Sequence, residues 1–251
     1  MVAQWLRGAV AACGFLTRIP LRLDEVRDAD LGRSVGFFPF VGLALGGVYA
    51  GAGWLLHGFL APAPAALLLV ALSCFATGGL HLDGLADVFD GLGSAAGDRD
   101  RMLSIMRDSR IGAHGAAALA LLLAGKLVAL APLLESGRYL MVAAAPAISR
   151  ACAVPFIIAY PYAREAGLGR AFHQMSGLRE GALAGLGAAG VLAGLLVGAG
   201  WSALVPAAAA LLVGGALAEW MRRRLGGLTG DVYGAIIELA EVTFLIGANV
   251  R

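Results

Sequence analysis

Three aspartates lie within two helical turns of a mostly apolar stretch of the sequence. Asp83, Asp87 and Asp90 are spaced i, i+4 and i+7, so a helix carries all three on one face. Stacked like charges repel one another, and a hard cation such as Mg²⁺ relieves that repulsion while bridging carboxylates to substrate phosphates. The spacing therefore predicts a magnesium site for a diphosphate substrate. A solvated helix end neutralised by Arg99 and Arg101 is the structural alternative.

Arginines follow the aspartates at a distance of about twenty residues. Arg107 and Arg110 are three residues apart and share one side, with Asp108 between them. Paired guanidinium groups suit bidentate recognition of phosphate, so these three residues are candidates for substrate binding. The accumulation of positive charge on the cytoplasmic side of membrane proteins is the other explanation for these arginines.

A further acidic group lies near the C-terminus. Asp231 follows a glycine-rich stretch, residues 226–230, in which a ligand can approach the backbone closely. Glu238 lies on the same helical face, one to two turns into an apolar segment, and an ionisable residue at such depth is a candidate site residue.

Two cations also lie within apolar segments. Lys126 and Arg150 either pair with Glu238 or Glu241 as structural bridges, or reach a substrate phosphate in an internal cavity. Sequence reasoning leaves both alternatives open.

The composition is that of an integral membrane protein. Of 251 residues, 59% are hydrophobic and 14% are charged, with a mean hydropathy of +0.80, whereas soluble domains carry about 25% charged residues. We expect one all-α, polytopic membrane domain covering residues 1–251. Apolar runs near the length that crosses a bilayer predict seven spans, or six and a re-entrant piece. They lie at 36–60, 63–80, 113–134, 139–160, 181–200, 203–221 and 232–249.

The loops between these spans place the predicted site on one side of the membrane. Nearly all arginines fall before the first span or in the loops near 81–112, 161–180 and 222–231, whereas the alternate loops hold only Arg138 and Arg251. The positive-inside rule then puts the N-terminus and the site in the cytoplasm. Residues 2–17 are expected to form an interfacial or short embedded helix, and residues 98–112 a short amphipathic one.

Several classes of protein are excluded. A net charge of +2 without a continuous basic face argues against nucleic-acid binding. Three isolated cysteines indicate neither disulfides nor a zinc site.

Glycine series at 42–53 and 185–194 predict close packing between helices, and small-residue faces of this kind permit a homo-oligomer.

Several motifs together resemble one enzyme family. The carriers are residues 15–20 (FLTRIP), 38–42, 77–91 (TGGLHLDGLADVFDG), 101–112, 162–169 and 226–231. In this order they resemble cobalamin synthase, the adenosylcobinamide-GDP ribazoletransferase family. The resemblance implies an inner-membrane enzyme that joins adenosylcobinamide-GDP to α-ribazole, or to its 5'-phosphate. The products are adenosylcobalamin, or its 5'-phosphate, and GMP, and Mg²⁺ is the implied cofactor.

The residues add a mechanism to this resemblance. Asp83, Asp87 and Asp90 are expected to hold the metal against the diphosphate, and arginines including Arg18 to steady its charge. A ribazole hydroxyl then attacks the cobinamide-linked phosphorus while GMP leaves. Asp90, Glu238 and His81 are the candidates for the general base.

Two other functions remain as alternatives. Residues 87–91 partly resemble the start of the CDP-alcohol phosphotransferase signature, typical of lipid-headgroup transferases, but the rest of that signature is missing. A small transporter would use Lys126, Arg150, Glu238 and Glu241 as a midplane relay. Against it, the chain shows no internal repeat and its charge is concentrated at one membrane face.

Overall fold

The computed structural model describes residues 2–21, 23–95 and 97–250, and these form an almost entirely helical chain. Arg22 and Arg251, which entered the count of loop arginines, lie outside these residues. Within them the one β contact is an isolated bridge between Tyr162 and Leu228. The prediction of an all-α fold is confirmed. The helices are α1 Val2–Leu16, α2 Asp28–Ser34, η1 Val35–Phe37, α3 Phe38–His57, α4 Pro62–Thr77, α5 Leu80–Ser94, α6 Arg99–Ile105, α7 Ala113–Glu135, α8 Tyr139–Ala159, α9 Leu168–Met175, α10 Leu178–Ala199, η2 Trp201–Ala203, α11 Leu204–Leu225 and α12 Gly230–Gly247.

Seven long helices occupy the seven predicted spans: α3, α4, α7, α8, α10, α11 and α12. Five stretches of the described chain are each long and apolar enough to cross a membrane: 28–57, 113–135, 139–159, 178–199 and 201–225. The bent pair of α4 and α5 counts as a sixth if it forms one span. By length and composition, five or six helices of the described chain can therefore cross a membrane, consistent with a polytopic protein of about the expected number of spans. The seventh helix, α12, carries three acidic residues, which its position inside the bundle explains.

The α4–α5 pair is bent by 92° at two consecutive glycines. Gly78 and Gly79 have φ angles of +67° and +73°, in the left-handed region that other residues rarely adopt. The break ends the predicted span at Thr77 and turns α5, which carries the three aspartates, away from the direction of α4. Residues 77–80 therefore form a sharp turn between α4 and α5, which the two glycines make possible.

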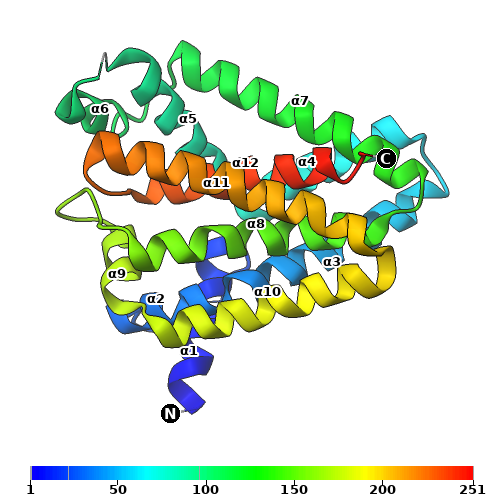
Figure 1. Ribbon diagram of the computed structural model, residues 1–251, viewed down its shortest axis with the longest axis horizontal. Coiled ribbons are helices and arrows are strands. Elements are labelled where there is room, and N and C mark those ends of the chain that lie inside the picture. Colours follow the sequence, from blue (N-terminus) through cyan, green and yellow to red (C-terminus); the bar gives the residue numbers. More distant parts are fainter. Residues whose placement is uncertain (1, 22, 96, 251) are drawn as a thin grey trace.

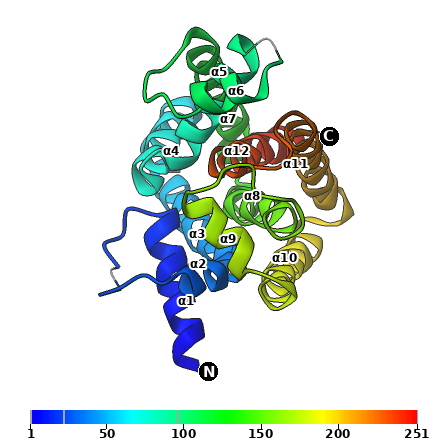
Figure 2. The ribbon, with the colours of Figure 1, turned by 90° about the vertical axis from the view of Figure 1, so that its left-hand side faces the viewer.

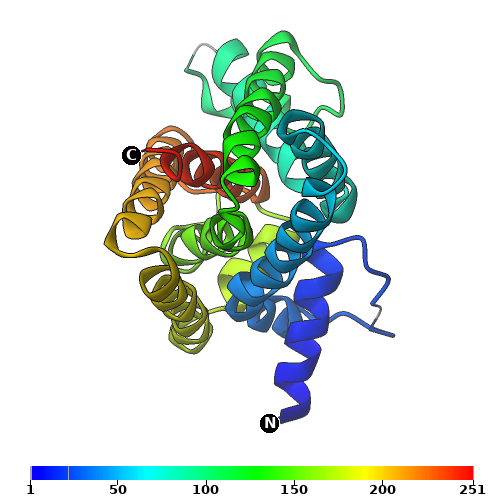
Figure 3. The same cartoon turned by 90° about the vertical axis from the view of Figure 1, so that its right-hand side faces the viewer.

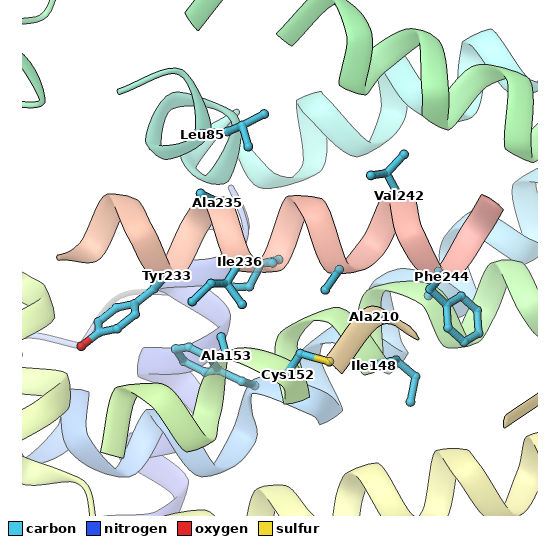
Figure 4. Packing of buried hydrophobic residues seen from close by; sticks show 14 of the residues in the cluster. Leu85, Ile148, Cys152, Ala153, Ala210, Tyr233, Ala235, Ile236, Val242 and Phe244 are labelled. Carbon is cyan, nitrogen blue, oxygen red and sulfur yellow. The ribbon is translucent and has the colours of Figure 1, made fainter. Parts of the chain in front are cut away.

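Helix α12 lies inside the bundle. Figure 2 shows α8 and α12 near the middle of the end view, and Figure 3 shows α10 and α11 on one side of α8 and α3 and α4 on the other. In Figure 4 apolar side chains of α12, including Ile236 and Phe244, pack between Leu85 of α5 and Cys152 of α8. Protein therefore shields most of α12, and an acidic residue on it need not face lipid.

Glycines set two of the close helix contacts. A Cβ at Gly84 of α5 would lie 2.7 Å from the carbonyl oxygen of Asp231, and one at Gly234 of α12 would lie 3.1 Å from the Cα of His81. These contacts bring the start of α12 against the aspartate-bearing face of α5. In the predicted series at 42–53, Gly46 meets α8 whereas Gly51 meets nothing within 4 Å, so only part of that series packs.

The connections that the arginine count assigned to one side lie together at one end of the bundle. In Figure 1 the segments around α2, α6 and α9 and the α11–α12 connection are at the left end, whereas the C-terminus is at the right. The expected N-terminal helix and short amphipathic helix correspond to α1 and α6. Arg7 of α1 pairs with Asp30 of α2 at 2.7 Å, which fixes α1 to the bundle.

Candidate active site

A cavity of about 650 Å³ opens at the end of the bundle that carries these segments. Asp83 and Asp87 of α5 line it, together with the Gly78–Gly79 corner. Arg110 contributes from the segment between α6 and α7. Within the described residues no arginine or lysine forms an ion pair with Asp83 or Asp87. Arg99 pairs with Asp100 instead, at 2.8 Å, so the neutralised helix end considered as an alternative is absent here.

A smaller chamber of about 160 Å³ adjoins this cavity. Asp83, Leu80, Phe15 and Leu168 line both spaces. The chamber adds the following polar side chains: His81 of α5, and Asp231 and Tyr233 of α12. Gly84 and Gly234, where α5 and α12 meet, also line the chamber.

Asp90 does not face the cavity. Its carboxylate is buried and accepts hydrogen bonds from the backbone N–H groups of Gly112, at 2.7 Å, and Gly115, at 2.8 Å. These groups begin α7, where unpaired N–H groups and the helix dipole favour a negative charge. Asp90 thus caps α7 from another helix, an arrangement that favours a structural role over those of third metal ligand and general base.

The remaining donors fit a magnesium ion held jointly with a substrate. The described residues contain no cluster of three or more His, Cys, Asp or Glu side chains that could hold a metal by themselves. However, Mg²⁺ keeps several waters and commonly takes one or two carboxylates with substrate phosphates. Asp83 and Asp87 supply two such carboxylates on one cavity wall.

The predicted arginines take different positions. Arg110 lines the cavity and pairs with Asp108 at 2.6 Å, and this hydrogen-bonded pair lowers the pKa of the Asp108 carboxyl to about 2. Arg107 is exposed and is not among the residues that line the cavity. Arg18 packs over the ring of Phe75, 5.5 Å from its centroid, beside the Gly78 corner. Arg18 is therefore at the edge of the cavity.

Arg164 is a residue of this site that sequence reasoning used only for topology. Its guanidinium pairs with Asp231 at 2.6 Å and donates to the carbonyl of Met106 at 3.2 Å. The site loops are joined further by Arg99, whose Nε donates to the carbonyl of Leu225 at 2.8 Å. The three predicted catalytic loops are thus brought together. The only signal in the sequence was the place of Arg164 in the motif at 162–169.

Glu238, a predicted general base, belongs to an ion-pair network inside the bundle. Lys126 contacts Glu238 at 2.7 Å and Glu241 at 2.8 Å, and Arg150 contacts Glu241 at 3.2 Å. All four side chains are buried, and none lines the cavity or the chamber. The alternative of structural bridges is the one this structure supports for Lys126 and Arg150. The same network favours a structural role for Glu238 over that of general base.

The fold and the site together define a class of protein. A polytopic helical membrane domain presents carboxylates and an arginine in a polar cavity at one end of the bundle, as expected of an enzyme acting on an anionic, phosphate-bearing substrate. None of the compared solved structures matches the chain.

Comparison with known proteins identifies the family. The family model for cobalamin-5-phosphate synthase matches residues 8–249. Adenosylcobinamide-GDP ribazoletransferase from Roseiflexus sp. (strain RS-1) is 42% identical over 93% of this chain and 86% of its own length. The enzyme of that name from Pseudomonas putida (strain W619) is 41% identical, and the one from Escherichia coli (strain K12 / DH10B) 39%, each over 94% of this chain and 96% of its own length. The chain belongs to the cobalamin-5-phosphate synthase family.

Proposed function

We propose that this chain is an adenosylcobinamide-GDP ribazoletransferase that uses Mg²⁺. It transfers the cobinamide phosphate moiety to α-ribazole or its 5'-phosphate, forms adenosylcobalamin or its 5'-phosphate, and releases GMP. The observation that carries the proposal is the pair of unpaired carboxylates, Asp83 and Asp87, beside Arg110 in one cavity of a chain from this family. A transporter relay or a lipid-headgroup transferase gains no comparable support.

In this proposal some residues of the cavity bind the metal and others bind the phosphates. Asp83 and Asp87 are the proposed ligands of Mg²⁺, which when bound supplies positive charge against the diphosphate. Arg110 binds a phosphate oxygen, and the Gly78–Gly79 corner holds α5 in place. Such transfer depends chiefly on position and on electrostatic stabilisation of the transition state.

The reaction exchanges a phosphoanhydride bond for a phosphoester bond. A ribazole hydroxyl oxygen forms a bond with the cobinamide-linked phosphorus, and the bond from that phosphorus to the oxygen of GMP breaks. The hydroxyl proton needs an acceptor. Of the three candidate bases, Asp90 caps α7 and Glu238 is paired with Lys126. His81, which lines the chamber beside Asp83, is the base that we propose.

We further propose that the chain lies in the cell inner membrane with the cavity open to the cytoplasm. Support comes from the arginines, which are concentrated in the segments at the cavity end of the bundle. Cysteine labelling from either side tests this orientation, with Arg138→Cys and Arg101→Cys as the two reporters. We expect Arg101→Cys to be labelled from the cytoplasm and Arg138→Cys from the other side.

The decisive experiment measures GMP release by the purified protein in liposomes. We expect release only when adenosylcobinamide-GDP, α-ribazole and Mg²⁺ are all present, and we expect a chelator to stop it. Release without ribazole would indicate hydrolysis, and no release from folded protein would contradict the proposed function. Release that a chelator leaves unchanged would contradict the role of the metal.

A further inference from the structure

The chamber beside the cavity has a chemistry of its own. We propose that it binds the aromatic base of the ribonucleoside whose hydroxyl attacks, with the Tyr233 hydroxyl donating a hydrogen bond to the ring nitrogen of that base. This assignment rests on the proposed function, because it names the subsite for one of the two substrates.

The walls of the chamber suit a flat apolar ring. Phe15, Phe38 and Phe172 come from α1, α3 and α9 and contact one another, with ring centroids 4.7 to 6.4 Å apart. Ile157 and Ile237 add aliphatic surface. Since the aromatic side chains support one another, the slot is formed before a ligand enters, and a flat ring gains contact area and edge-to-face interactions.

Two polar side chains of the chamber lack the partners that buried groups normally have. The Tyr233 hydroxyl and both ring nitrogens of His81 make no hydrogen bond to any described residue, although only 5% of Tyr233 and 4% of His81 is exposed. Buried polar groups are nearly always hydrogen-bonded, and those left unpaired are costly. A ligand in the chamber is the natural partner, and Figure 4 shows Tyr233 projecting from α12 on the side opposite Leu85.

The number of unpaired groups selects between the bases of the two substrates. The base of ribazole is a fused bicyclic ring, apolar except for one ring nitrogen that accepts a hydrogen bond. A single tyrosine O–H satisfies that acceptor. The guanine of the GDP-linked substrate has several donors and acceptors along its edges. In the chamber Asp231 is already paired with Arg164 and Asp83 is a proposed metal ligand, so most of those groups would be left unpaired against phenylalanine and isoleucine.

The location connects base binding to the chemistry. Asp83 lines both the chamber and the cavity, so a ribonucleoside with its base in the chamber directs its ribose towards the proposed metal site. His81 lies in the same chamber, where a ring nitrogen can accept the proton of the attacking hydroxyl. Tyr233 thus forms a hydrogen bond with the base, and His81 accepts the proton of the attacking hydroxyl.

The test compares two ribonucleosides in the full-length protein in liposomes. One is α-ribazole, and the other is its analogue in which a C–H group replaces the accepting ring nitrogen. With Tyr233→Phe we expect the KM for ribazole to rise about tenfold, as loss of one buried hydrogen bond predicts. The KM for the analogue and the KM for adenosylcobinamide-GDP should each stay within about twofold of the wild-type values.

Tyr49→Phe is the matched control. Tyr49 is also a buried tyrosine whose hydroxyl has no partner among the described residues, but it lies on α3 beside Lys126 and Glu241, outside the chamber. We expect this variant to leave both KM values unchanged. Ile237→Phe, which fills the chamber, should raise the KM for ribazole and for the analogue alike, in protein whose thermal unfolding is first shown to be cooperative.

Three results would overturn the assignment: an unchanged KM for ribazole in Tyr233→Phe, an equal rise for ribazole and the analogue in that variant, or a rise confined to adenosylcobinamide-GDP. The last would place guanine in the chamber. Calorimetric binding of ribazole without the second substrate separates this assignment from the proposed function. If wild-type protein binds ribazole but releases no GMP, the proposed function fails, and the same Tyr233→Phe comparison made on binding still decides the assignment.

Discussion

Two acidic clusters of this molecule resemble each other in sequence and differ in their partners. Inside the bundle, Glu238 and Glu241 are matched by Lys126 and Arg150, so four buried charges balance. At the end of the bundle, Asp83 and Asp87 line a cavity and form no ion pair with any described arginine or lysine. The number of carboxylates therefore does not mark a site. What distinguishes the cavity is that its charges are left for a ligand to neutralise.

The largest effect should come from removing an unpaired carboxylate. Asp83→Asn or Asp87→Asn should lower kcat for GMP release about a thousandfold, because each removes a proposed metal ligand and almost no packing. The midpoint of thermal unfolding should stay near that of the wild type. Asp24→Asn, in an exposed loop, is the control and should change neither quantity. Full activity in either variant would remove that residue from the metal site.

The interior cluster should show the opposite pattern. Lys126→Met leaves Glu238 and Glu241 with one cation fewer, which should cost about 3–5 kcal/mol of folding free energy. Denaturation of the protein in detergent micelles measures that loss. Adding Glu238→Gln restores the charge balance and should recover part of it. If Lys126→Met instead abolished GMP release at wild-type stability, the division between a structural and a chemical cluster would be wrong.

A moderate effect is expected at the corner that positions the unpaired carboxylates. Gly78→Ala places a side chain at a φ of +67°, which should cost about 1–2 kcal/mol, and its Cβ would lie 3.1 Å from the Cγ of Arg18. We expect lower stability and a lower kcat, since α5 shifts. Gly51→Ala, at an open position in α3, should be neutral or stabilising. A kcat equal to that of the wild type in Gly78→Ala would show that the corner does not position α5.

The smallest effect should come from the exposed arginines. Arg110→Ala should raise the KM for adenosylcobinamide-GDP about fivefold, and Arg107→Ala by less, because Arg110 lines the cavity and Arg107 does not. Since the pKa of Asp108 is lowered to about 2, that carboxylate loses its charge only as the pH falls towards this value. The ratio of the two KM values should therefore be constant between about pH 6 and 9. Equal KM values in both variants would indicate that these arginines only set the orientation of the chain in the membrane.

The sequence predicted the fold more completely than the site. Apolar length and the distribution of arginines located all seven long helices, because both depend on local composition. The sequence also assigned the loops that carry Asp83, Asp87 and Asp231 to one side of the membrane, and the structure brings these residues near one another. Helical periodicity could not separate Asp90 from the two aspartates that line the cavity. The spacing gives the direction in which a side chain leaves its helix, but not the group that it contacts there. The neighbour is the start of α7, 22 to 25 residues further along the chain.

The pairing of Arg164 with Asp231 was also beyond local reasoning, because 67 residues and two long helices separate them. The depth of Glu238 in an apolar segment marked it correctly as unusual. That signal cannot distinguish a residue that meets a substrate from one that meets Lys126. The two cases differ in which group contacts the Glu238 carboxylate, and that depends on how α7 and α12 pack against each other.

The order of synthesis gives the Arg164–Asp231 pair a consequence for biogenesis. The contact of Asp90 with α7 joins neighbouring helices, so it can form early as the chain leaves the ribosome. The chamber of the site, in contrast, needs α12, which follows the other described helices in the chain, because Tyr233 and Asp231, the partner of Arg164, both belong to it. A chain that still lacks α12 thus carries Asp83 and Asp87 but no finished chamber. The chamber is therefore complete only when α12 has been inserted, after all the described helices that precede it.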